Sequence, residues 1–214
     1  MRFLTFHRLL FAIFWFSLVG ASGQTALRIN EFMAVNTRTV QDADGDYSPW
    51  IEIYNPTTNN VNLSGWALTT DPTNLMQWRF PQVTLLDSDD ANQSDNFMVV
   101  FASGKNRTNN TAELHSNFQL PTAGGFLELV DPSTNIVAVF NSYPAQQPDI
   151  SYGLDSADLT TEGYFVNSTP GKKNSMSGAT AAPGMVFSQT GRAFSTPFAL
   201  ELSSGAGAAI YYTT

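Results

Sequence analysis

The sequence predicts an all-β protein, folded as an antiparallel sandwich or a closed barrel. About eight short segments alternate between apolar and polar residues, which is the two-residue period of a half-buried strand. Turns rich in Gly, Pro and Asn separate these segments, and no stretch has a convincing helical period. This spacing of strands and turns is typical of all-β domains rather than of α/β folds.

The best-defined strand is expected around Trp50. Ile51 and Ile53 share one face of this segment, whereas Trp50, Glu52 and Tyr54 share the other. An acidic turn precedes the segment and an Asn-Pro turn follows it. We therefore expect one buried face, and we interpret Trp50 and Tyr54 as the best candidates for an exposed contact surface.

The first strand is expected at residues 27–33. Its alternation slips near Glu31, and this slip is expected to leave Leu27, Ile29 and Met33 on the buried side.

Two tryptophans mark the next strands. Trp66 follows at hairpin distance from the preceding strand, with a bulge or bend at Ser64-Gly65. Trp78 and Phe80 share one face of a later segment. Both tryptophans are expected in the core, because each heads an apolar face.

The most hydrophobic run is at residues 96–102, which are predicted to form a strand. Its continuous apolar run between turn residues indicates a central strand that is buried on both faces. Residues 124–131 and 136–140 are predicted to face each other in a hairpin, across the five-residue connection 131–135.

The chain after the first 23 residues is divided into three parts. Residues 24–174 are predicted to form the sandwich, and Tyr152 and Phe165 are expected to pack the returning chain on it, although the regular alternation fades there. Residues 175–183 have the composition of a flexible linker. Alternation resumes in 184–214, which is too short for a stable domain alone, so we expect a truncated β module and a fragment of a longer protein.

The first 23 residues are interpreted as a secretory signal peptide. Arg2 and Arg8 form a basic region, residues 9–19 are almost wholly apolar, and residues 21–23 are small enough for cleavage. A membrane anchor is the weaker alternative, because this apolar run is shorter than the ~20 residues that span a bilayer. The mature protein is therefore expected to be secreted or held in the cell envelope.

Composition restricts the possible partners and chemistry. Residues 1–23 hold two of the ten Lys and Arg residues and none of the eighteen Asp and Glu residues, so the mature chain has a formal charge of −10. Such an acidic surface repels a phosphate backbone, and nucleic acid is not an expected partner. The chain has no Cys, which excludes disulfides, thiol catalysis and thiolate metal sites.

Five short segments carry a characteristic combination of residues: 50–55 (WIEIYN), 63–66 (LSGW), 78–81 (WRFP), 98–104 (MVVFASG) and 125–129 (GFLEL). In this order and spacing they resemble the lamin tail domain, an immunoglobulin-like β-sandwich of nuclear lamins and of exported bacterial proteins. The resemblance covers about residues 27–174, and segments 29–34 and 169–174 are similar to the bacterial branch. It implies an immunoglobulin-like antiparallel β-sandwich.

The residues from Val186 resemble, more weakly, the start of the small β module at the C-termini of chitobiases and related hexosaminidases. The segment 210–214 (IYYTT) carries this resemblance. It implies a larger secreted protein in which a catalytic region, such as a spore-coat-type kinase or a hydrolase, follows residue 214.

No assembled set of catalytic residues is predicted. His115 is the one histidine after residue 23, and without a nucleophile motif or a second histidine it is expected to face solvent. Glu52 and Glu128 would be a carboxylate pair for acid–base work, but strand-borne acids are more often the solvated side of a sheet. We predict no catalytic, cofactor-binding or metal-ligating residues, no cofactor and no enzymatic activity.

One acidic turn is the best metal candidate. Asp42, Asp44 and Asp46 alternate like the start of a calcium loop. Gly45 lies before the third Asp, however, and Ile53 occupies the position of the closing Glu, so an EF-hand is excluded. A turn shaped by Asx hydrogen bonds is favoured, and an irregular calcium site is the alternative.

Two functional hypotheses follow. The first is a non-catalytic structural or interaction module of an exported multidomain protein, which displays loops on a rigid sandwich and binds a protein or a cell-surface polysaccharide. The alternative is a carbohydrate-binding accessory region of a larger secreted enzyme, with Trp50 and Tyr54 as stacking residues. The sequence leaves the ligand and the oligomeric state open.

Overall fold

A computed structural model describes residues 27–87, 96–109, 112–174, 186–188, 196 and 199–203. These residues contain fourteen strands and no helix, which confirms the all-β prediction. No helix long and apolar enough to cross a membrane occurs in this part of the chain. The predicted signal peptide, the linker 175–183 and the strand expected around Ile210 lie outside the described residues.

Ten strands form two sheets. The larger sheet is built from β1 (Arg28–Met33), β2 (Trp50–Tyr54), β7 (Phe97–Phe101), β8 (Leu114–His115), β11 (Ser151–Leu154) and β12 (Glu162–Phe165). The smaller sheet is built from β4 (Ala67–Thr69), β5 (Trp78–Arg79), β9 (Gly125–Val130) and β10 (Ile136–Tyr143). Their strand orders are β12-β11-β1-β2-β7-β8 and β10-β9-β4-β5.

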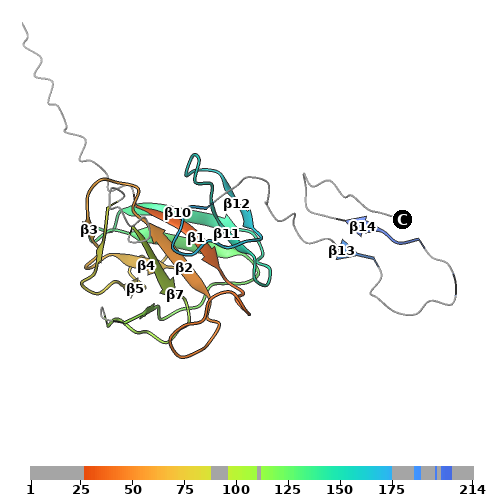
Figure 1. Ribbon diagram of the computed structural model, residues 1–214, viewed down its shortest axis with the longest axis horizontal. Helices are drawn as coiled ribbons and strands as arrows, with labels where there is room; N and C mark the ends of the chain where they lie inside the picture. Colours follow the sequence, from red (N-terminus) through yellow and green to blue (C-terminus); the bar gives the residue numbers. More distant parts are fainter. Residues whose placement is uncertain are drawn as a thin grey trace, which may run out of the picture.

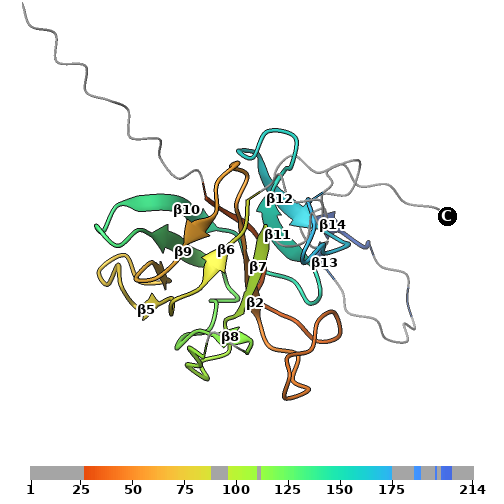
Figure 2. The ribbon, with the colours of Figure 1, turned by 60° about the vertical axis from the view of Figure 1, so that its left-hand side comes forward.

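The two sheets face each other as the layers of a sandwich (Figure 1). In Figure 2, the smaller sheet with β9 and β10 lies to the left of β2, β7 and β11 of the larger one. Neighbouring strands are antiparallel except β7 and β8, which pair in parallel. The immunoglobulin-like sandwich expected from the sequence is therefore the fold.

Two small pairs of strands complete the described structure. β3 (Val61–Asn62) pairs with β6 (Thr84–Leu85), and β13 (Val186–Phe187) pairs with β14 (Leu202–Ser203). The second pair lies in the region where alternation was expected to resume. It contains two of the strands anticipated there.

A β-bulge in β1 decides which side chains face which layer. The register of β1 against β2 shifts between Ile29 and Glu31, so Asn30 is the extra residue. Ile29 and Phe32 consequently belong to the main core. Met33 is buried as expected, but it packs in a second cluster on the opposite face of the sheet.

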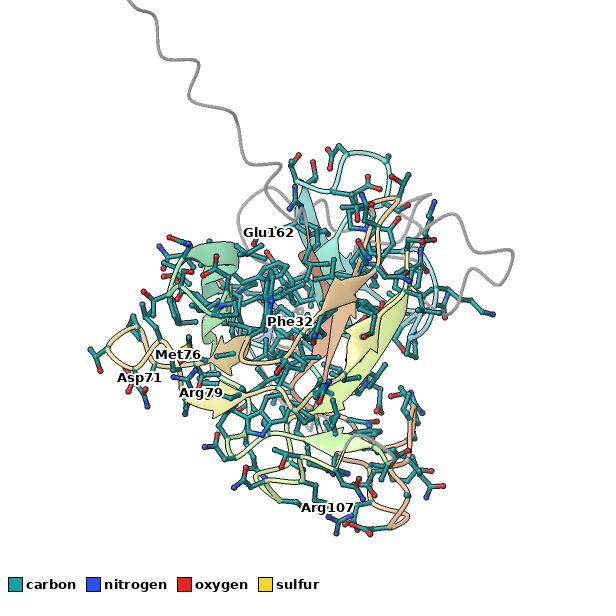
Figure 3. The ribbon with its side chains drawn as sticks, turned by 90° about the vertical axis from the view of Figure 1, so that its left-hand side faces the viewer. Phe32, Asp71, Met76, Arg79, Arg107 and Glu162 are labelled. Carbon is teal, nitrogen blue, oxygen red and sulfur yellow. The ribbon has the colours of Figure 1, made fainter. Side chains whose placement is uncertain are left out.

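The core fills the space between the layers. Phe32 lies at its centre, with its ring centroid 5.1 Å from that of Phe140 on the smaller sheet in an edge-to-face contact. Figure 3 shows Phe32 in the middle of the sandwich. Trp66 and Trp78 also lie in this core, which confirms their predicted positions.

The outer face of the larger sheet is covered, and the prediction that Trp50 and Tyr54 are exposed is wrong. Trp50 is 0% exposed and packs with Met33 and Phe101, while Tyr54 is 5% exposed and stacks on Phe97 at a centroid distance of 4.5 Å. Val40, in the loop before β2, packs against the cluster of Met33, Trp50 and Phe101. Strand alternation separated the two faces correctly, but it carries no information on which loops fold over them.

Two further expectations need correction. The strand after Trp66, β4, pairs with β5 and β9 in the smaller sheet, so it forms no hairpin with β2. A turn closed by the Trp66 amide and the Leu63 carbonyl, with Gly65 at a φ of +80°, redirects the chain. The region where alternation was expected to fade forms two regular strands, β11 and β12, and in them Tyr152 and Phe165 are buried as predicted.

The hairpin of β9 and β10 has the five-residue connection that the sequence indicates. The strand β7 lies between β2 and β8, as expected for its apolar run, with two of its five side chains only half buried.

Candidate functional site

His115 is an internal residue, and the prediction that it faces solvent is wrong. Its side chain is 0% exposed, its Nδ1 lies 2.9 Å from the Ser103 hydroxyl, and its ring stacks on Phe101. The parallel pairing of β8 with β7 draws it into the fold. Burial, together with the charges of Lys105 and Arg107, lowers the pKa of His115, so the imidazole is neutral at neutral pH.

The acidic turn is held by hydrogen bonds to its own backbone. Asp42 Oδ1 accepts the amides of Asp44 and Asp46, each at 3.0 Å, and the Asp42 carbonyl accepts the amide of Gly45 at 2.8 Å. The Ser48 hydroxyl donates to Asp42 Oδ2 at 2.8 Å. The favoured interpretation, a turn shaped by Asx hydrogen bonds, is therefore confirmed.

A lysine ammonium lies between the three carboxylates of this turn. Lys105 Nζ is 2.6 Å from Asp42, 2.6 Å from Asp44 and 2.9 Å from Asp46, and Arg107 adds a 2.7 Å ion pair to Asp44. Figure 3 places Arg107 at one end of the sandwich. Two positive side chains from the loop after β7 thus hold the turn before β2 in place.

This charge cluster defines what the turn can bind. Burial opposes ionisation of Asp42, but the hydrogen bonds from Lys105 and Ser48 outweigh it, and its pKa is lowered. The candidate ligand oxygens of Asp42, Asp44 and Asp46 lie within 4.8 Å of one another. A calcium ion would have to displace the Lys105 ammonium from the position that it shares with all three.

Glu52 and Glu128 do not form a pair, and neither lies on a solvated face. Glu52 is on β2 of the larger sheet and Glu128 on β9 of the smaller one, and their exposures are 0% and 3%. Burial raises the pKa of the Glu128 carboxyl. The structure instead brings Glu52 together with a carboxylate that sequence reasoning did not single out.

That carboxylate is Glu31. The bulge at Asn30 places Glu31 directly opposite Glu52 on the neighbouring strand, and both side chains are 0% exposed. Asn30 Nδ2 donates to Glu52 Oε1 at 2.8 Å, and the Ser151 hydroxyl forms a short hydrogen bond with Glu31. Asn30, Glu31, Glu52 and Ser151 form a buried polar site that we call the cradle.

The cradle is occupied by residues 169–174, which we call the clasp. The amide of Thr169 donates to Glu31 Oε2 at 3.0 Å, and the amide of Gly171 donates to Glu52. Asn174 Nδ2 reaches the carbonyls of Asn30 and Leu154, each at 2.9 Å.

The clasp joins the two ends of the domain. Asn174 lies 144 residues after Asn30, and its Oδ1 accepts a 3.1 Å hydrogen bond from Asn30 Nδ2. Close packing beneath this contact requires a glycine at position 153, where a Cβ would lie 2.3 Å from the Asn30 carbonyl oxygen. The clasp is thus a structural closure of the domain.

The buried pair has perturbed acidity. Desolvation raises the pKa of Glu52 to about 8, against the hydrogen bonds from Gly171 and Asn30 and assisted by the charge of Glu31. Desolvation likewise raises the pKa of Glu31, despite its hydrogen bonds from Ser151 and Thr169. The pair therefore retains at least one proton at neutral pH.

Sequence reasoning missed most of these residues. Asn30, Glu31, Ser151 and Asn174 are polar residues without a motif of catalytic or metal-binding spacing. The usable signal was the alternation slip near Glu31, because a bulge turns a carboxylate to the other face of its strand. The sequence placed Lys105 in a turn and did not predict its contacts with the acidic turn.

One groove lies away from these clusters. It has a volume of about 430 Å³ and is lined by residues such as Val137, Leu154, Leu159 and Glu162, between β10 and the hairpin of β11 and β12. Figure 3 shows Glu162 at the end of the sandwich opposite Arg107. The described residues that line the groove include no pair of catalytic groups.

Comparison with known proteins agrees with this architecture. The family model described as Lamin Tail Domain matches residues 21–143, which is more than half of the chain. No curated protein matches. The motifs WIEIYN, LSGW, WRFP, MVVFASG and GFLEL all fall inside the matched region. The chain belongs to the lamin tail domain family.

Proposed function

We propose that this protein is a non-catalytic structural or interaction module of an exported multidomain protein. The carrying observation is that Glu52, Glu128 and His115, which the sequence offers for acid–base chemistry, are buried in the fold, as is Glu31. Glu31 and Glu52 bind the clasp, Glu128 is buried in the smaller sheet and His115 bonds Ser103. Catalysis needs such groups beside a reacting atom, and here they are enclosed.

The expected setting is the cell envelope or the extracellular space. The basic and apolar residues 1–23 support export, and the charge of −10 on residues 24–214 supports a protein or polysaccharide partner rather than nucleic acid. The β13–β14 pair after the clasp supports a second module in the same chain.

Turnover measurements test this proposal. Purified residues 24–214 are expected to show no activity on a panel of hydrolase and kinase substrates. Activity that is abolished by Glu52→Gln or by His115→Ala, in variants that retain the wild-type circular dichroism, would overturn it. Glu113→Gln is the matched control, because Glu113 is exposed and lies near the acidic turn.

The carbohydrate-binding alternative loses its stacking residues, because Trp50 and Tyr54 are buried. Among the side chains whose burial the structure describes, Tyr47 is the one aromatic that is substantially exposed, at 41%. A single ring offers a weaker platform than the two adjacent rings expected from the sequence. Retention of residues 24–214 on chitin or peptidoglycan at low salt, reduced by Tyr47→Ala, would support this alternative; no retention would exclude it.

A further inference from the structure

The Glu31–Glu52 pair has no cationic partner in the described part of the chain. Ion pairs there involve Asp42, Asp44, Asp46 and Asp149, and none involves either glutamate. Two ionised carboxylates side by side and out of water are strongly disfavoured. The closed arrangement therefore favours a pair that keeps at least one proton.

The hydrogen bonds around Glu31 accommodate that proton. A protonated Glu31 can donate to the Ser151 hydroxyl, which then directs its own hydrogen to the Phe165 carbonyl, 3.4 Å away. The other oxygen of Glu31 continues to accept the Thr169 amide. Protonation thus preserves the contacts that bind the clasp.

The clasp contributes no strand to either sheet. None of its residues belongs to a strand, and it is held to the cradle by hydrogen bonds from Thr169, Gly171 and Asn174. The two amides that bind the carboxylates belong to the clasp, whereas the β1–β2 ladder is independent of it. Once the clasp has left, water can solvate both carboxylates.

We propose that residues 169–174 form a proton-gated clasp, which stays bound to the cradle while the Glu31–Glu52 pair holds a proton and is released when the pair becomes fully ionised. Release frees a segment of six residues between β12 and the residues that follow position 174. Six extended residues span roughly 20 Å, so release lengthens the tether to those residues by up to that distance.

The direction of the pH dependence follows from the acidity of the pair. The pKa of Glu52 is about 8 in the closed state, whereas an exposed glutamate has a value near 4.5. Closure is therefore favoured below about 4.5 and weakens as the pH rises through 8. The charged groups of the clasp, Lys172 and Lys173, are exposed, and the neighbouring strands present Val99 and Ser151 to the pair.

A spin label on the clasp tests the proposal. The chain has no Cys, so Lys173→Cys creates a single labelling site at an exposed position. The label spectrum is recorded from pH 5 to pH 10 together with far-ultraviolet circular dichroism. A label at Ser133→Cys, in the exposed turn between β9 and β10, reports on a region that is not expected to change.

We expect the Lys173→Cys label to be immobile at pH 5 and to gain a mobile component with a midpoint near pH 8, with no change in circular dichroism. Glu31→Gln places an amide that can donate to Ser151 and accept from Thr169, and it is expected to keep the clasp closed up to pH 10. Glu128→Gln, which removes a buried carboxyl from the other sheet, is expected to leave the midpoint unchanged.

Three outcomes would overturn the proposal. The label stays immobile up to pH 10, or it loosens with the same midpoint in Glu31→Gln, or it loosens only when the circular dichroism of the sandwich is lost. The first would show that the closed pair tolerates full ionisation, the second that Glu31 is not the gate, and the third that the clasp does not open separately.

Discussion

The ammonium of Lys105 lies 2.6 Å from the carboxylate of Asp42, whose side chain is fully buried. This contact ties the loop after β7 to the turn before β2 and closes one end of the sandwich. Because Asp42 also anchors the backbone of its own turn, the ion pair stabilises a whole loop rather than two surface side chains.

Lys105→Met should therefore destabilise the protein. It leaves the buried Asp42 carboxylate without its cation, and we expect the free energy of unfolding to fall by about 2 kcal/mol. Urea denaturation measures the change. Lys173→Met is the control, since Lys173 is exposed, and it should change stability by less than ~0.5 kcal/mol. Equal effects of the two substitutions would contradict a special role for Lys105.

Asn174→Ala should destabilise the domain by about 3 kcal/mol. It removes hydrogen bonds to the carbonyls of Asn30 and Leu154 and leaves these buried groups unpaired. Thermal or urea unfolding measures the loss. Asn59→Ala, at an exposed loop position, serves as the matched control and is expected to be nearly neutral. A neutral Asn174→Ala would show that the clasp adds nothing to the fold.

Gly153→Ala should destabilise the protein as well. The added Cβ would lie 2.3 Å from the Asn30 carbonyl and 2.8 Å from the Cα of Glu31, and backbone atoms cannot move aside cheaply. We expect a loss of about 2–3 kcal/mol from overpacking. Unchanged stability would mean that β1 and β11 are not as closely packed as described.

Stability should be highest on the acidic side of neutrality. Folding raises the pKa values of Glu31 and Glu52, so their contribution is fully present below about 4.5, and the part that Glu52 supplies is lost as the pH rises through about 8. Asp42 and Asp44 act in the opposite sense, because folding lowers their pKa values, and their contribution is lost as the pH falls below 3.8. The free energy of unfolding is expected to be highest at about pH 5.

Urea denaturation at several pH values measures this profile. Between about pH 5 and pH 9, the free energy of unfolding should fall by roughly 3–5 kcal/mol, and Glu31→Gln should flatten the decline. A stability that rises over this range would contradict the assigned burial of the pair.

The fold was largely predictable from the sequence, and the buried polar site was not. Alternation at Ile51 and Ile53 identified the core face of β2, because that face contacts the second layer directly. The opposite face of β2 was wrongly expected to be exposed. Its burial depends on long loops, and the local sequence pattern does not predict where these loops lie. The contact of Asn174 with Asn30 joins residues that are 144 positions apart, and the sequence around either residue does not indicate which residue it contacts.

The family match ends at residue 143, yet strands β11 and β12 and the clasp follow it. We therefore expect a domain that requires residues up to 174. β11 pairs with β1 inside the larger sheet, so a chain ending at 143 would leave one edge of β1 unpaired.

The most direct measurement compares the unfolding of residues 24–174 with that of residues 24–166, which lack only the clasp and the residues leading to it. We expect residues 24–174 to unfold cooperatively with the stability of 24–214, and residues 24–166 to be less stable by several kcal/mol at pH 6. Equal stability of the two shorter chains would contradict the claim that Glu31 and Glu52 are structural residues that close the sandwich through the clasp.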